Sequence, residues 1–117
     1  MSEPSVTDLS FLKIYASGNT KLMKNFIESF LEKTPKSIQL LEDHLAANDF
    51  HSLSRSAHSL KPQLSYMGIK SAHDLIVEIE ESAKNQTGAE NLAASINSLK
   101  EILEEAYSEL RSKFNEF

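Results

Sequence analysis

Apolar residues recur at every third or fourth position along most of this chain, which is the spacing of one face of an α-helix. Four long segments carry the pattern, at residues 20–47, 50–67, 69–86 and 92–114. A shorter segment follows Thr7 or Asp8, either of which can cap a helix, and it has Leu9, Leu12 and Tyr15 at helical spacing. No segment shows the period of two that is typical of β-strands. The pattern therefore predicts an all-α protein.

Turn and capping residues separate these segments. Gly18 followed by Asn19 is a helix stop and then a new helix start. Asp49 can cap the second long helix, Gly68 can end it, and Gly88 separates the last two helices. Each boundary thus coincides with a residue type that favours a helix end.

Pro35 falls inside the first long segment. A proline within a helix removes one hydrogen bond and bends the chain. No glycine or other turn residue surrounds Pro35, so we expect one kinked helix from Thr20 to Ala47 rather than two helices. At about 1.5 Å per residue this helix would be about 40 Å long.

Short connections between long amphipathic helices make successive helices antiparallel neighbours. We therefore expect an antiparallel up-and-down four-helix bundle with a short extra helix at the N-terminus. A chain of 117 residues is large enough for one core without disulfides or a structural metal. Residues 1–6 are expected to be a disordered lead, and residues 7–117 a single domain.

The charge and composition exclude several classes of function. A net charge of −5 disfavours nucleic-acid binding, which needs a basic surface. The chain has no cysteine, so it has neither a disulfide framework nor a thiolate metal site. No apolar run approaches the roughly 20 residues that span a bilayer, and the N-terminus lacks the pattern of a signal peptide. We expect a cytoplasmic monomer that does not bind membranes.

His58 is the residue with the clearest chemical potential. It lies on the flank of the apolar seam of the helix at 50–67, about a third of a turn from the seam's centre. Ser54, Lys61 and Ser65 share that flank, and Lys61 is one turn away, where its ammonium can reach an anion held at the ring. A neutral imidazole is a nucleophile. The geometry alone also allows a partly buried, hydrogen-bonded histidine without any chemistry.

The other polar clusters carry no comparable signal. His51 is two turns from His58, about 10 Å along the axis, which is too far to share one metal ion. None of the four histidines has a glutamate three residues before it, as di-iron bundles require, so no metal site is expected. No glycine-rich phosphate loop is present, so neither ATP-dependent kinase activity nor a cofactor is expected.

The sequence resembles the histidine phosphotransfer (HPt) domains. Their signature is matched by Ala57–Lys61, which reads A-H-S-L-K, and by Gly68 ten residues after the histidine. Asp49 and the pair Ile79–Glu80 also fit the family pattern, as do Leu9, Leu12 and Gly18 near the N-terminus. Pro62 departs from the pattern, because it stands where the family has a glycine after the lysine.

The resemblance implies a phosphorelay. His58 would accept a phosphoryl group from the aspartyl phosphate of a receiver domain and pass it to another receiver. Lys61 would stabilise the phosphoryl charge, and Glu80 would hold one ring nitrogen of His58 so that the other is the nucleophile. The implied partners are the receiver domains of response regulators and of hybrid histidine kinases.

Five residues around His58 are candidates for docking a receiver: Ser54, Arg55, Pro62, Ser65 and Tyr66. The serines are small, Arg55 could steer a negatively charged receiver, and Tyr66 could add apolar contact. Pro62 is expected to bend the helix locally or to leave the carbonyl of His58 free for water.

The alternative function is a helical module that binds receivers or other proteins without phosphotransfer. A solvent-accessible His58 flanked by Lys61 and Glu80 would favour the relay.

Overall fold

The computed structural model describes residues 5–117, apart from the side chain of Ala89, and its described part contains helices and no strand. The helices are α1 (Ser10–Tyr15), α2 (Thr20–Ala46), α3 (Phe50–Tyr66), α4 (Lys70–Asn85) and α5 (Ala89–Glu116). The prediction of an all-α protein is therefore confirmed. The last helix begins three residues earlier than expected, directly after Gly88.

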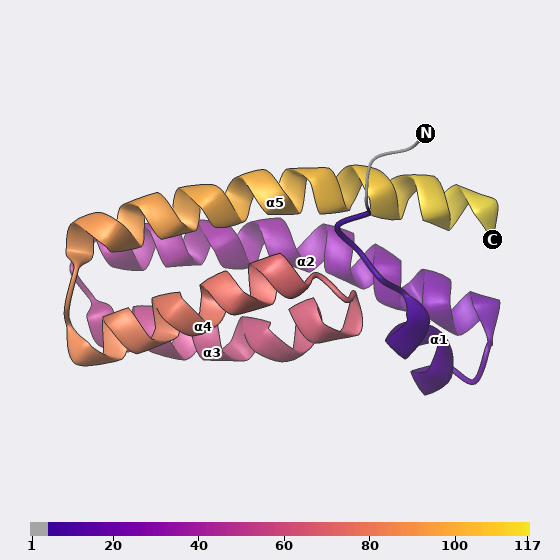
Figure 1. The fold of residues 1–117 in the computed structure, drawn as a ribbon, viewed down its shortest axis with the longest axis horizontal. Helices are drawn as coiled ribbons and strands as arrows, with labels where there is room; N and C mark the ends of the chain where they lie inside the picture. The colour runs from indigo at the N-terminus through magenta and orange to yellow at the C-terminus, as the bar shows by residue number, and fades with distance from the viewer. Residues whose placement is uncertain (1–4) are drawn as a thin grey trace.

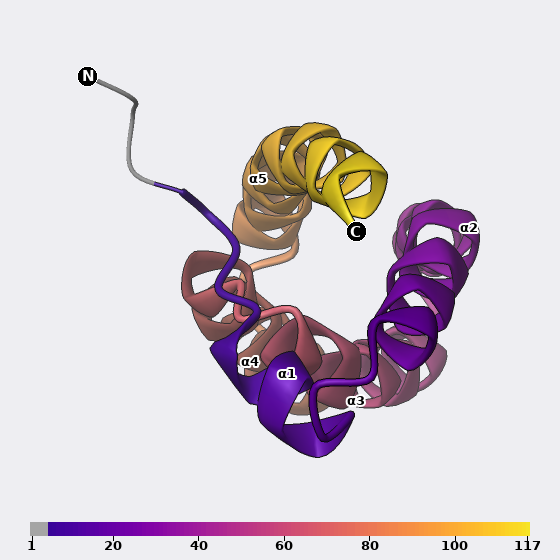
Figure 2. The same cartoon turned by 90° about the vertical axis from the view of Figure 1, so that its right-hand side faces the viewer.

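The four long helices form an antiparallel up-and-down bundle. Viewed along the bundle in Figure 2, they lie around a ring in chain order, and α5 returns to pack beside α2. Figure 1 shows that α2 and α5 run the length of the molecule, whereas α3 and α4 are shorter. The short α1 lies near the turn where α3 ends and α4 begins, next to the start of α2.

The core follows the apolar period of each helix. In α3 the predicted seam is buried, including Leu53, Ala57 and Leu64. In α2, by contrast, Leu22 is 39% exposed. The buried residues of this helix are Met23, Ile27, Phe30, Thr34, Ile38 and Leu41. Leu22 belongs to the first turn of α2, at the end of the bundle, which explains why its apolar side chain is not enclosed. The fully buried large side chains include Leu12, Ile27, Leu41, Leu53, Leu60, Leu64, Ile76, Ile79, Leu99 and Leu103.

Asn19 and Asp49 cap their helices as predicted, whereas the N-cap of α1 is Leu9 rather than Thr7 or Asp8. The Asn19 side chain accepts a hydrogen bond from the Leu22 amide at 3.0 Å, and Asp49 accepts one from the Ser52 amide at 3.1 Å. Asp8, which precedes that N-cap, still accepts a hydrogen bond from the Ser10 amide at 3.0 Å. These bonds satisfy amides that the first turn of a helix leaves without a partner.

The predicted disordered lead falls partly outside the described residues. Residues 1–4 are not described, so that part of the prediction stays open. Ser5 and Val6 are described, and they lie against α5, where the Val6 amide donates to Glu109 Oε2 at 2.9 Å.

None of the helices in the described part of the chain has both the length and the apolar character needed to cross a membrane.

Pro35 lies within α2, which continues through it as one helix from Thr20 to Ala46. The preference for one helix over two is confirmed, and the kink remains a prediction.

The neighbouring Thr34 is fully buried, and its hydroxyl has no hydrogen-bond partner among the described residues. A buried hydroxyl without a partner lowers stability, because it has lost its hydrogen bonds to water.

We expect Thr34→Val to raise the free energy of unfolding by about 1 kcal/mol, since valine has nearly the same shape and no polar atom to satisfy. Urea denaturation measures this change as a higher midpoint at unchanged slope. Thr87→Val, at an exposed position, controls for the substitution itself. A loss of stability in Thr34→Val would mean instead that the hydroxyl bonds a buried water molecule.

Candidate functional site

His58 lies on the outer flank of α3, with its side chain 68% exposed. Its neighbours Ala57 and Leu60 are buried, so α3 packs firmly on the bundle at this position. Because one helical position corresponds to about 100° of rotation, a buried Ala57 places His58 at the edge of the core rather than inside it. The ring is therefore both fixed at its base and open to solvent.

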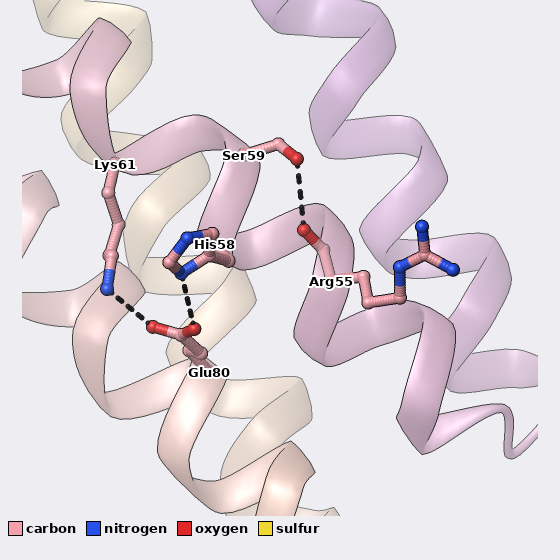
Figure 3. Close-up of polar contacts among 5 residues, drawn as sticks. All are labelled: Arg55, His58, Ser59, Lys61 and Glu80. Atoms are coloured by element: carbon pink, nitrogen blue, oxygen red, sulfur yellow. Dashed lines mark hydrogen bonds and ion pairs between the residues drawn. The ribbon is translucent and has the colours of Figure 1, made fainter.

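Glu80 of α4 joins His58 and Lys61 into one cluster (Figure 3). Its Oε2 lies 2.8 Å from His58 Nδ1, and its Oε1 lies 2.7 Å from Lys61 Nζ. The side chains of Glu80 and Lys61 are only 19% and 28% exposed. Ile79, which precedes Glu80, is fully buried in the core, and α4 packs against α3. The packing of the two helices thus brings the carboxylate of one to the histidine and lysine of the other.

The hydrogen bond from Lys61 lowers the pKa of Glu80 below its usual value of 4.5; partial burial raises it, and the bond to His58 lowers it further. Glu80 is consequently ionised near neutral pH, and an ionised carboxylate only accepts hydrogen bonds. His58 Nδ1 must then carry the proton and donate it to Glu80. In the neutral ring this assignment leaves the lone pair on Nε2, which is the nitrogen not engaged by Glu80.

Lys61 occupies the position that its spacing predicts, one turn after His58 on the same flank of α3. Its ammonium binds Glu80 rather than the ring, so that Lys61 and His58 converge on the same carboxylate (Figure 3). A positive charge therefore lies next to the place where an anion attached to His58 would be held.

An open hollow of about 590 Å³ adjoins His58. Ser54 and Arg55 line it together with His58, so the structure brings two of the predicted docking residues to the candidate nucleophile. The Arg55 guanidinium points away from the ring in Figure 3. The Ser59 hydroxyl donates to the Arg55 carbonyl at 3.1 Å, so that hydroxyl bonds its own helix.

The remaining predicted docking residues lie further along α3. Pro62 and Ser65 are exposed, and α3 continues through Pro62 to Tyr66 as one helix. His58 has thus not been turned into the core; a bend at Pro62 remains a prediction. Tyr66 is half-buried and packs against Phe11 and Tyr15 of α1, with ring centroids 5.6 and 5.3 Å away.

Sequence reasoning missed the aromatic cluster that Tyr66 completes. Phe11, Tyr15, Phe26 and Tyr66 come from three helices, and each contacts at least two of the others. The sequence contains one sign of this cluster: Phe11 and Tyr15 are one helical turn apart, which places two aromatic side chains on the same face of α1. No group of three or more potential metal ligands gathers within residues 5–117, as far as the structure describes them.

Comparisons with known proteins identify the family of the chain. The Hpt domain family matches residues 25–113. A comparison with curated proteins gives no match. Among solved structures, the chain is similar to histidine-containing phosphotransfer protein B from Pseudomonas aeruginosa PAO1, with a TM-score of 0.86, 21% identity and 99% of each chain covered. It is also similar to the HPT domain of the Hpt sensor hybrid histidine kinase from Shewanella, with a TM-score of 0.80, 21% identity and 96% of each chain covered. The structural likeness concerns the fold, while the sequence match spans most of the chain; the protein belongs to the Hpt domain family, the histidine phosphotransfer domains of phosphorelays.

Proposed function

We propose that His58 is the phosphoacceptor through which this Hpt domain protein relays phosphoryl groups between receiver domains. The observation that carries the proposal is the exposed His58 ring, held at Nδ1 by the ionised Glu80 with Lys61 alongside. A module that only binds proteins has no need of this combination. The relay is therefore favoured over the non-catalytic alternative.

In the proposed step, the Nε2 lone pair of His58 attacks the phosphorus of an aspartyl phosphate on the donor receiver. The new bond joins Nε2 to phosphorus, and the bond from phosphorus to the aspartate oxygen breaks, which restores the aspartate carboxylate. Nδ1 keeps its proton throughout, so the phosphorylated ring gains positive charge. The Glu80 carboxylate, 2.8 Å from Nδ1, stabilises that charge. Transfer to the second receiver is the reverse reaction with a new aspartate.

Lys61 has a second role in this proposal. A phosphoryl group on Nε2 carries negative charge beside the Lys61 ammonium, and charges this close interact favourably when they are partly shielded from water. The Lys61 side chain is flexible and 28% exposed, so its ammonium can turn from Glu80 toward the phosphoryl group. Lys61 would thus stabilise the phosphorylated form more than the free form.

The receiver is proposed to dock over the face of α3 that carries His58. Ser54 and Arg55 lie on one side of the ring, and Pro62, Ser65 and Tyr66 lie on the other. The small side chains near His58 leave room for the rim of the receiver's active site, and Arg55 offers a positive charge to an acidic surface. In this proposal the protein acts as a cytoplasmic monomer, and its partners are receivers of response regulators and hybrid histidine kinases.

The test is phosphoryl transfer from a panel of phosphorylated receiver domains to the purified protein. We expect at least one receiver to transfer radiolabelled phosphate, and the label on this protein to be labile in acid and stable in alkali, as a phosphohistidine is. A second, unlabelled receiver should then remove the label. If receivers bind, as a titration would detect, yet none transfers label, the protein is an interaction module instead.

A further inference from the structure

Residues 5–9, which we call the N-terminal strap, cross the bundle before α1 begins. The strap starts at α5 and ends near the turn between α3 and α4, as the path of the chain in Figure 1 shows. It contains no helix of its own, yet Thr7 is only 4% exposed. Such burial of an irregular segment requires specific partners for its polar groups.

Glu109 of α5 fastens the first half of the strap. Its carboxylate accepts hydrogen bonds from the Val6 amide at 2.9 Å, the Thr7 amide at 3.1 Å, the Thr7 hydroxyl at 2.8 Å and the Ser5 hydroxyl. Lys113, one turn later on α5, donates to the Thr7 hydroxyl at 2.8 Å. Partial burial raises the pKa of Glu109, but these hydrogen bonds outweigh it and lower the pKa to about 2. The carboxylate is therefore ionised, and it organises three consecutive residues.

The second half of the strap packs against Gly68. The Asp8 amide donates to the Met67 carbonyl at 3.1 Å, which brings the strap against the turn between α3 and α4. Gly68 has a φ of +63°, and a Cβ at this position would overlap the Asp8 carbonyl. Glycine is thus required for two reasons, the left-handed backbone and the close approach of the strap.

The strap determines where α1 can lie, because α1 begins directly after it. Leu12 is the one fully buried residue within α1, and Leu9 and Ala16 at its two ends also pack against the core. Phe11 and Tyr15 stay 51% and 55% exposed, and their rings contact Tyr66. Tyr66 lies on α3 about two turns beyond His58, on the face where we place the receiver.

We propose that Glu109 and Gly68 are positioning residues for receiver docking: they fix the strap, the strap fixes α1, and α1 holds Tyr66 and its aromatic neighbours in the orientation that the receiver binds. This inference rests on the proposed function. Neither residue touches the reacting atoms, so both act on the binding of the receiver and not on the chemistry of His58.

The experiment compares Glu109→Ala with Glu105→Ala, a matched change at an exposed glutamate one turn earlier on α5. The rate of phosphoryl transfer is measured against the concentration of a receiver that labels the wild type. We expect Glu109→Ala to raise the KM for the receiver about tenfold, a loss typical of disturbing a well-packed interface residue, and to leave kcat unchanged. Glu105→Ala should match the wild type in both.

Two further measurements separate positioning from a general loss of structure. Labelling of His58 by phosphoramidate, a small phosphoryl donor that needs no docking, should proceed at the wild-type rate in Glu109→Ala. Amide hydrogen exchange should show α1 opening faster while α3 and α4 keep their protection. If Glu109→Ala does not fold, Glu109→Gln retains one acceptor oxygen and replaces it in all three measurements.

Gly68→Ala tests the other end of the strap, with Gly88→Ala as its control. Both glycines have positive φ, at +63° and +65°, but only at Gly68 would a Cβ meet backbone. We expect Gly68→Ala to raise the KM as Glu109→Ala does, and Gly88→Ala to leave it unchanged. An unchanged KM in variants whose α1 is shown to open would overturn the role of the strap. A wild-type protein that no receiver labels would contradict the proposed function itself, so the two failures are distinct.

Discussion

Replacing His58 by glutamine is expected to abolish phosphoryl transfer, with a loss of at least about 10³-fold, because the variant lacks the imidazole that Glu80 holds at Nδ1. The nitrogen lone pair of an amide is delocalised into its carbonyl, so glutamine cannot attack phosphorus. The side chain of His58 is 68% exposed, and the change removes no core contact. The free energy of unfolding should therefore change by no more than about 0.5 kcal/mol. The measurement is radiolabel transferred from a phosphorylated receiver to each protein.

His51→Gln is the matched control for this variant. His51 is an exposed histidine two turns earlier on the same helix, and it should be replaceable without effect on transfer. Binding of the receiver to His58→Gln should remain measurable, which shows that the docking face is intact. Acid-labile label persisting on His58→Gln would mean that another histidine is the acceptor, and the assignment of His58 would be wrong.

The fold could be predicted from the sequence because its determinants are local. Each long helix carries an apolar period, and Asn19, Asp49 and Gly68 mark the boundaries with residue types that cap or end helices. Pro35 did not mislead the prediction, since its surroundings lack turn residues and α2 continues through it. Short turns then leave the antiparallel bundle as the simplest arrangement.

The site could be predicted only in part. The proximity of His58 and Lys61 follows from their spacing on one helix, but the bridge through Glu80 joins α3 to α4 and depends on how the two helices are rotated. No periodicity distinguishes Glu80 from Glu78 or Glu81, its neighbours on α4. Its selection came from the resemblance to the HPt domains, and the structure supplies the physical reason, a carboxylate within hydrogen-bond distance of both partners.

The strap was not predictable from any local pattern. Its contacts with α5 join residues more than 100 positions apart, such as Val6 and Glu109, which are separated by 103. In the sequence Glu109 resembles every other acidic residue on the outer face of α5. Gly68 was expected to end a helix and matched the HPt signature, but its role in the close approach of Asp8 requires knowledge of what packs over the turn.

Glu80→Ala is expected to slow phosphoryl transfer about tenfold to a hundredfold, the range typical of removing a group that orients a metal-binding histidine. Without the carboxylate, His58 is free to place its proton on Nε2, and that tautomer has no lone pair at the attacking nitrogen. The phosphorylated ring also loses the negative charge beside Nδ1. Glu80→Gln should be slowed less, because its amide oxygen can still accept from Nδ1. The same receiver-transfer assay measures both rates, and ¹⁵N shifts of the imidazole report the tautomer directly.

Glu81→Ala is the control for the transfer assay, since Glu81 is an exposed carboxylate next in sequence on α4.

The stability of the variants tests the charge of Glu80 independently of transfer. Its pKa lies below the usual 4.5, so its ionised form stabilises the folded protein above about pH 4.5, and that contribution is lost as the pH falls toward the lowered pKa. The difference in unfolding free energy between wild type and Glu80→Gln should therefore shrink on acidification. If Glu80→Ala keeps both the wild-type rate and the wild-type tautomer, the carboxylate serves only as the partner of Lys61, and the orientation of His58 must come from the packing of α3 alone.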